Sequence, residues 1–122
     1  MTRSSESSAP STVAAVDVAA LLDDLRAPDW QTAVRAAERL RDVPGDAVTQ
    51  ALVDALDAHD TAITAAAAES LILRNEPTTA ERLWQALARL DDDVSDQVWD
   101  AVYAHPEHAV SRELERRYEA QS

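Results

Sequence analysis

The stretch "TAAAAESL", Thr64–Leu71, places four consecutive alanines near the middle of a 122-residue chain that contains a single glycine. Alanine has the highest helix propensity of all amino acids, so this stretch predicts a helix. Its side chain nevertheless contributes little apolar area to a hydrophobic core. Small residues on a helix allow neighbouring helices to approach closely. The stretch therefore predicts a helix that is packed tightly against others.

The overall composition favours a single helical domain. A length of 122 residues corresponds to one domain, and alanine, leucine, arginine, glutamate and aspartate dominate the sequence. Phenylalanine is absent and glycine nearly so, which argues against sheets and their turns. The absence of cysteine excludes disulfides, thiolate zinc sites and a cysteine nucleophile.

The two ends of the chain differ from its middle. The first residues, "MTRSSESSAPST", are polar and contain no apolar core of a signal peptide, so residues 1–13 are expected to form a disordered leader. Residues 14–119 are expected to form the helical domain, and residues 120–122 a short tail. No apolar run reaches the roughly 18 residues of a membrane span. We therefore expect a cytoplasmic protein without membrane contact.

The chain is strongly acidic. It has 23 acidic residues, 11 arginines and no lysine, which gives a net charge of −12. A field of this sign repels phosphate backbones, so nucleic-acid binding is not expected. Two explanations of the acidity remain open. It is either a solubility trait of a salt-adapted or high-GC lineage, or a means of attracting a basic partner.

An internal repeat gives the chain its organisation. Residues 20–40, 51–71 and 82–102 align without gaps at a spacing of 31 residues. The first two segments share leucines, acidic residues and alanines at equivalent positions, and the third is more divergent. In each unit an aspartate (Asp29, Asp60 or Asp91) precedes the second helix and is expected to cap it.

Each repeat is interpreted as a helix, a turn and a second helix. Apolar residues recur at intervals of three and four, as in Val18, Leu21, Leu22 and Leu25, which is the period of an amphipathic helix. A last helix has no partner and is expected to cap the array. The predicted first helices are 15–26, 47–57 and 78–90, the second helices are 31–42, 62–74 and 94–104, and the last helix is 107–119.

The sequence "VRAAERL" at residues 34–40, with its echo "AAESL" at residues 67–71, resembles the HEAT-repeat family. The resemblance covers about residues 15–119. It implies an all-α fold: a short right-handed α-solenoid of about three HEAT-like antiparallel helix pairs plus a C-terminal capping helix. It also implies that the second helices line the concave face and that the protein serves as a scaffold, adaptor or inhibitor.

Two motifs contain residue types that bind metal ions. The run "DDDVSD", residues 91–96, lacks the glycine and the final glutamate that an EF-hand loop requires, so it is interpreted as helix capping. In "HPEH", His105 and His108 lie three residues apart, which suits a shared metal ion. No third ligand is evident, and Pro106 is expected to start the last helix and leave His105 outside it. The motif is therefore interpreted as a polar turn, and no metal or cofactor is expected.

Nothing in the sequence indicates catalysis. The single glycine, Gly45, excludes a glycine-rich phosphate loop, and His59 has no evident nucleophile or acid beside it. The chain is therefore not expected to be an enzyme, and no catalytic residue is assigned.

Tryptophan and charged residues supply the candidate binding sites. Trp84 is expected in the core. Trp30 is placed at the rim of the first repeat, where it either staples the helix start or contacts a partner. Trp99 replaces an alanine of the first two repeats, so it either fills space before the last helix or anchors a partner. Tryptophan and arginine are enriched at binding hot spots.

Charged pairs one turn apart complete the predicted surface. Arg35 and Arg39 are expected on the second helix of repeat one, and Asp96 and Asp100 on that of repeat three. This pattern is typical either of a solvated helix face or of a surface that runs from basic to acidic. The sequence predicts a non-catalytic protein-binding module, an adaptor or scaffold. The alternative is an acidic, immunity-type inhibitor that neutralises a basic partner such as a toxin or nuclease.

Overall fold

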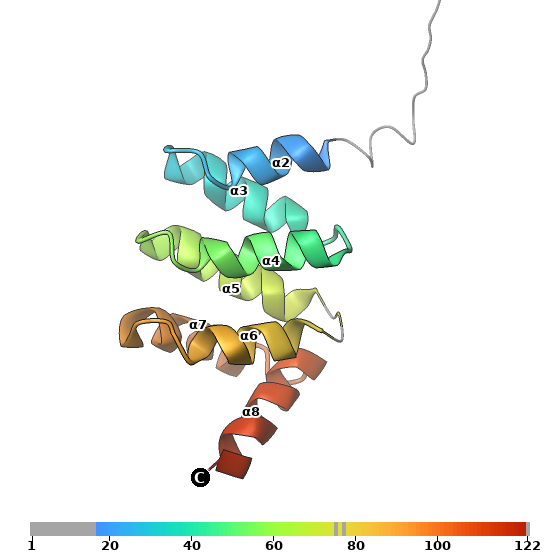
Figure 1. Cartoon of the computed structure of the whole chain (residues 1–122), viewed down its shortest axis with the longest axis vertical. Helices are drawn as coiled ribbons and strands as arrows, with labels where there is room; N and C mark the ends of the chain where they lie inside the picture. Colours follow the sequence, from blue (N-terminus) through green and yellow to red (C-terminus); the bar gives the residue numbers. More distant parts are fainter. Residues whose placement is uncertain (1–16, 75, 77, 122) are drawn as a thin grey trace, which may run out of the picture.

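The computed structural model describes residues 17–74, 76 and 78–121, and this part of the chain is all-helical with no strand (Figure 1). The predicted all-α fold is therefore confirmed. The predicted leader, residues 1–13, lies outside the described residues. None of the described helices combines the length and apolar composition needed to cross a membrane. The helices are α2 (Val18–Asp24), α3 (Trp30–Leu40), α4 (Asp46–Ala55), α5 (Thr61–Leu73), α6 (Thr79–Leu87), α7 (Asp92–Ala104) and α8 (Ala109–Gln121).

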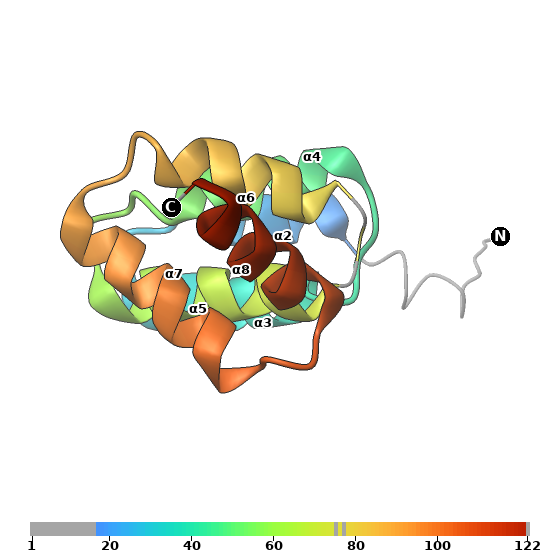
Figure 2. The same ribbon diagram turned by 90° about the horizontal axis from the view of Figure 1, so that it is seen from below.

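The helices lie in two layers. In Figure 1, α2, α4 and α6 lie one below another in front of α3, α5 and α7. Helix α5 packs against α3 on one side and α7 on the other, and α4 packs against α5 and α6. Figure 2 shows α8 crossing the lower end of both layers, where it contacts α6, α7 and α5.

The four-alanine stretch lies on α5, the helix with most neighbours. Its buried residues cover all but one face of the helix: Ile63, Thr64, Ala66, Ala67, Ala68, Ser70, Leu71 and Ile72. Ala62, Ala65 and Glu69 occupy the remaining, partly open face. A helix that is buried around most of its circumference belongs to the centre of a fold. Alanine is suited to this position because α3, α4, α7 and α8 all pack around α5.

Close helix contact also satisfies buried hydroxyl groups. The Ser70 hydroxyl donates a 2.9 Å hydrogen bond to the Ala37 carbonyl oxygen of α3. The Thr64 hydroxyl donates a 3.0 Å hydrogen bond to the Leu56 carbonyl oxygen at the end of α4. A side chain as short as serine reaches another helix backbone only where the facing residues are small. These bonds remove the cost of burying an unpaired hydroxyl.

Two of the three predicted aspartate caps are confirmed. Asp29 accepts a hydrogen bond from the Thr32 amide at 3.2 Å, and Asp60 accepts from the amides of Ala62 and Ile63 at 2.9 and 3.1 Å. Asp91 occupies the N-cap position of α7, but its side chain makes no capping bond, so that prediction is wrong. Asp92 and Asp93 in the first turn of α7 place negative charge at the helix N-terminus instead.

A buried arginine that the repeat pattern did not predict joins the first and second repeats. The Arg74 side chain is 1% exposed and donates to the carbonyl oxygens of Leu40 and Gly45 at 2.8 and 3.2 Å, and also to that of Val43. It forms a 2.8 Å ion pair with Glu76. The Arg74 side chain therefore connects carbonyl groups at and after the end of α3 to the segment that follows α5.

Two of the differences between predicted and observed helix boundaries change the turns before and after α7. Helix α6 ends at Leu87 rather than at residue 90, and residues 88–90 form the turn before α7. Helix α8 begins at Ala109, so Pro106 lies in a turn instead of starting the helix. The His108 amide donates to the His105 carbonyl at 3.2 Å, which closes this turn. Turn closure at residues 105–108 is the local reason why the helix starts later.

Candidate protein-binding surface

Trp30 is half exposed at the first position of α3. Its exposed fraction is 48%, which is high for a residue with such a large apolar area. A turn precedes it, because α2 ends at Asp24 and the Asp29 side chain caps the start of α3. The Thr32 hydroxyl donates to Asp29 at 2.7 Å and lowers the pKa of its carboxyl group, which favours the charged form that accepts these bonds.

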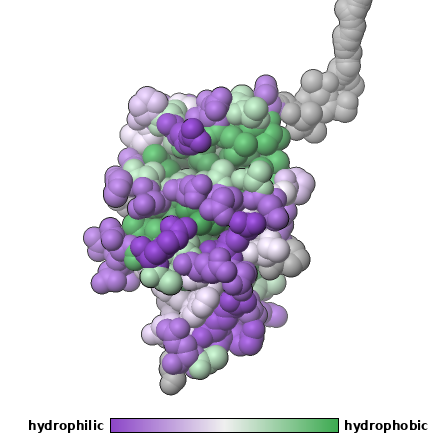
Figure 3. Space-filling view, in the orientation of Figure 1, coloured by the Kyte–Doolittle hydropathy of each residue, from purple (hydrophilic) through white to green (hydrophobic). Residues whose placement is uncertain are grey.

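A groove of about 570 Å³ lies beside Trp30, where the turns of the first and second repeats meet. Figure 3 shows hydrophobic surface along α2 and α4, the helices that border this groove, with hydrophilic side chains around it. Its volume lies in the range of ligand-binding clefts. The apolar lining is Leu22, Leu25, Ala27, Pro28, Trp30, Ala51, Ala55, Ala58 and Ile63, and the polar lining is Arg26, Asp54, His59 and Asp60.

The part of the groove lining that comes from the second repeat includes His59, a residue with an unusual backbone conformation. His59 has a φ of 60°, in the left-handed region that few residues other than glycine adopt. Asp60, which follows it, uses its carboxylate to cap α5. Asp54 is exposed and accepts from Gln50 at 2.9 Å. The groove thus combines an apolar floor with exposed charges of both signs, Asp54 and Arg26, in its lining.

Trp99 lies at the opposite end of the molecule. It is partly buried, packs against the core, and lines a groove of about 320 Å³ together with Trp84 and Tyr118. Its ring centroid is 6.0 Å from that of Tyr103 and 5.5 Å from that of Tyr118. Such spacing is typical of aromatic pairs that stabilise one another. Trp99 therefore joins α7 to α8.

Arg35 and Arg39 do not line the same groove as Asp96 or Asp100, with which they were predicted to form one binding surface. Both line a shallow groove between α2 and α3, next to Leu21 and Asp24. The structure does not bring them into a common groove with Asp100.

Asp100 instead lies in a groove across α3, α5 and α7. Its floor includes Val34 and alanines of α5, and its acidic residues are Glu38, Glu69 and Asp100. These three carboxylates are 31 residues apart in sequence, so each occupies the same position of its repeat. Asp96 is exposed on α7 and lies outside the lining of this groove.

Sequence analysis missed two parts of these surfaces. The 31-residue spacing of Glu38, Glu69 and Asp100 in the sequence predicts their common face and is the signal that could have identified this groove. The groove beside Trp30 depends on the distance between the turns of the first two repeats. This distance cannot be predicted from local sequence patterns.

Comparison with known proteins adds no relative: no protein-family model, curated protein sequence or solved structure matches this chain. The described residues form a groove beside the exposed Trp30, a groove that contains the carboxylates of Glu38, Glu69 and Asp100, and an aromatic cluster near the C-terminal end of the helical domain.

Proposed function

We propose that the protein is a non-catalytic protein-binding module, an adaptor or scaffold, that binds a partner segment in the groove beside Trp30. The observation that carries this proposal is a half-exposed tryptophan on the rim of an apolar groove of about 570 Å³. Hot spots in interfaces are typically tryptophans that lie beside a pocket. The partner residue would bury apolar area against Trp30 and Leu22, the driving force of most such associations.

We further propose that the architecture is a short HEAT-like α-solenoid with three helix pairs and a capping helix. The serial packing of α3, α5 and α7 supports this proposal, as does the 31-residue spacing of equivalent residues. In repeat arrays each unit buries its apolar face against the next, and grooves between units serve as binding surfaces. The groove beside Trp30 lies at such a junction.

The groove favours a particular chemistry in its partner. Its floor suits one aromatic or aliphatic side chain, and the exposed carboxylate of Asp54 suits a neighbouring lysine or arginine. The net charge of −12 would steer a basic segment toward the protein. We therefore expect a short peptide segment with an apolar anchor next to a basic residue.

An inhibitor of a basic protein is the second candidate, and the carboxylate-lined groove favours it. Glu38 and Asp100 are exposed and form no ion pair with any residue that the structure describes. A row of carboxylates at regular spacing could imitate the charge of a phosphate backbone. Binding of this kind would depend on electrostatic attraction and would weaken steeply with added salt.

Peptide selection tests the first proposal. A random peptide library displayed on phage is selected against the immobilised full-length chain, and enriched peptides are measured by calorimetry with wild type and Trp30→Ala. We expect the enriched peptides to contain an apolar residue beside a lysine or arginine. Their affinity for Trp30→Ala should be at least about tenfold weaker than for wild type, as for a hot-spot residue. Tyr103→Ala is the matched control, because Tyr103 is exposed and lies outside the groove lining.

Two results would overturn the groove proposal. One is equal affinity of the selected peptides for wild type and Trp30→Ala. The other is affinity that is retained by Trp30→Ala and lost in Glu38→Gln/Asp100→Asn. The second result, together with a collapse of binding between low and high salt, would support the inhibitor.

A further inference from the structure

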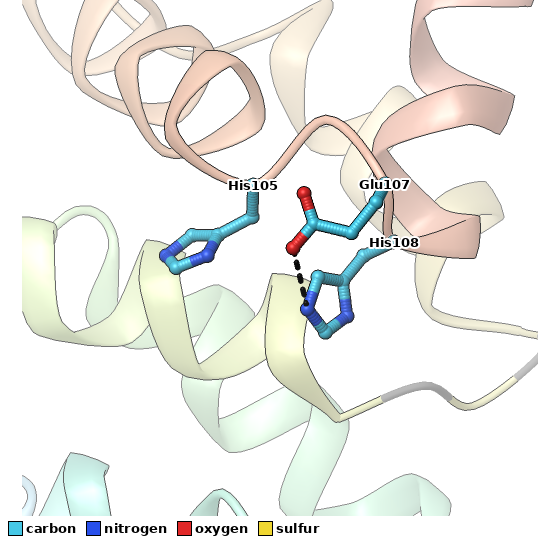
Figure 4. Close-up of side chains that lie close together, drawn as sticks. All are labelled: His105, Glu107 and His108. Atoms are coloured by element: carbon cyan, nitrogen blue, oxygen red, sulfur yellow. Dashed lines mark ion pairs between the residues drawn. The ribbon is translucent and has the colours of Figure 1, made fainter.

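The turn between α7 and α8 gathers three groups that bind metals. His105 follows α7, His108 precedes α8, and Glu107 lies between them (Figure 4). One ligand atom from each residue lies within 4.8 Å of the others. The Glu107 carboxylate oxygen is 3.6 Å from Nε2 of His108, and the imidazole rings are nearly perpendicular, with centroids 5.7 Å apart. The closed turn, rather than a helix, brings these side chains together.

A fourth residue, distant in sequence, orients the first histidine. Nε2 of His105 lies 3.0 Å from Oε2 of Glu69 on α5. The other oxygen of Glu69 forms an ion pair with Arg41 at 3.3 Å, which holds the carboxylate in place. When His105 donates its Nε2 proton to Glu69, the lone pair of Nδ1 is left to bind a metal. Metal-binding histidines commonly donate their second ring nitrogen to a carboxylate in this way.

We propose that His105, Glu107 and His108 form a binding site for a divalent transition-metal ion such as Zn²⁺, with Glu69 as the residue that positions His105. Two imidazole nitrogens and one carboxylate oxygen favour zinc, cobalt, nickel or copper over calcium or magnesium, which prefer oxygen ligands. Water molecules would complete the coordination.

The distances fit this assignment with small side-chain movements. Zinc binds nitrogen and oxygen at about 2.0–2.2 Å, so tetrahedral ligand atoms lie roughly 3.3–3.6 Å from one another. Glu107 and His108 already meet this requirement at 3.6 Å. His105 and His108 are partly buried, with side chains 24% and 30% exposed, whereas Glu107 is 68% exposed. The site therefore has two restrained ligands and one that is free to adjust, and it is open to solvent.

Calorimetric titration of the metal-free full-length chain with ZnCl₂ tests the proposal. We expect one ion per chain with a dissociation constant in the micromolar range. His105→Ala and His108→Ala should each weaken binding at least tenfold. Glu69→Gln should weaken it by roughly 10-fold, the lower end of the effect of removing an orienting partner. His59→Gln is the matched control because His59 is the one other histidine in the sequence and lies in a different turn. It should leave the affinity unchanged.

Imidazole nitrogen resonances of the wild-type chain provide a readout that does not depend on the folding of any variant. During titration with ZnCl₂ the resonances of His105 and His108 should shift and saturate together, while those of His59 remain in place. The proposal is overturned if no saturable binding occurs, if His59→Gln weakens binding as much as His108→Ala, or if the two turn histidines do not respond.

Discussion

Arg74 and Glu76 form a 2.8 Å ion pair whose arginine is almost fully buried and whose glutamate is 23% exposed. Thr49 joins them, since its hydroxyl accepts from Arg74 and donates to Glu76, both at 2.9 Å. Glu76 also accepts from the Gly45 amide at 3.0 Å. The pair therefore binds the connection between α3 and α4 to the connection between α5 and α6, and it aligns consecutive repeats.

Removing the arginine should destabilise the fold strongly. Arg74→Met keeps most of the apolar length but removes the guanidinium hydrogen bonds to the carbonyls of Leu40 and Gly45, and the positive charge that pairs with Glu76. Loss of one partner of a buried pair costs about 3–5 kcal/mol. We expect a loss near 3 kcal/mol by urea denaturation, because Glu76 keeps contact with water. Arg89→Met, at an exposed position, serves as control, and an equal effect there would contradict this role of Arg74.

The Glu76 carboxylate should make stability depend on pH. The Gly45 amide, with Arg74 and Thr49, lowers the pKa of Glu76 below its ordinary value of 4.5. A group whose pKa is lower in the folded state stabilises fully above its unfolded pKa, and this contribution disappears as pH falls through the folded pKa.

Glu76→Gln should therefore be less stable than wild type at pH 7, by roughly 1.5–3 kcal/mol, the range for hydrogen bonds to charged groups. This difference should shrink as pH falls below about 4.5 and the wild-type carboxylate takes up a proton. Urea denaturation of both proteins at pH 7 and pH 3 measures the difference in unfolding free energy between them at each pH. A difference that stays constant would show that the charge of Glu76 is unimportant.

The alanines of α5 should differ sharply in their tolerance of a larger side chain. Ala67 is fully buried where α5 meets its neighbours, so Ala67→Leu should cost about 1–3 kcal/mol through overpacking. Ala65 is exposed on the same helix, so Ala65→Leu should change stability by less than about 0.5 kcal/mol. Thermal and urea denaturation compare the two. Similar effects would mean that the helices around α5 separate easily.

The tryptophans at the two ends should also differ in their contribution to stability. Trp99 contacts Tyr103 and Tyr118 and packs against the core, so Trp99→Ala should cost roughly 2–4 kcal/mol, somewhat below the value for a fully buried ring. Trp30→Ala should cost less than about 1 kcal/mol because half of the side chain is exposed. Denaturation measures both values, and a large loss for Trp30→Ala would assign this residue to the fold rather than to binding.

If the turn between α7 and α8 binds zinc, the ion should stabilise the protein. It would link the two helices through His105 and His108, and Glu69 would extend this link to α5. Zinc at about 100 times its dissociation constant stabilises the folded state by about 2.7 kcal/mol. This corresponds to an increase in Tm of roughly 10 °C for a domain of this size. Differential scanning calorimetry should show no increase for His108→Ala.

Local patterns predicted the helices well because helix formation depends on local propensity and on the period of apolar residues. The predicted ranges 31–42 and 62–74 correspond to α3 and α5 within two residues at each end. The caps at Asp29 and Asp60 were also predicted, since a cap involves residues two or three positions apart. A polar turn at residues 105–108 was predicted, but its extent was not, because a proline is compatible with both a turn and the start of a helix, and α8 begins at Ala109 rather than near Pro106.

The candidate sites were predicted only in part. Trp30 was placed at the rim of a repeat with a structural and a binding role both left open, and the structure shows it half exposed. The shared face of Glu38, Glu69 and Asp100 was not predicted, although their 31-residue spacing encodes it. By itself, then, the sequence determined the helices, their order and the equivalence of positions between repeats. Only the tertiary structure decided that Arg74 binds the carbonyls of another repeat and that Glu69 meets His105, 36 residues away. Such contacts depend on how helices pack in space, and neither local propensity nor apolar period encodes the position of a side chain relative to a distant segment.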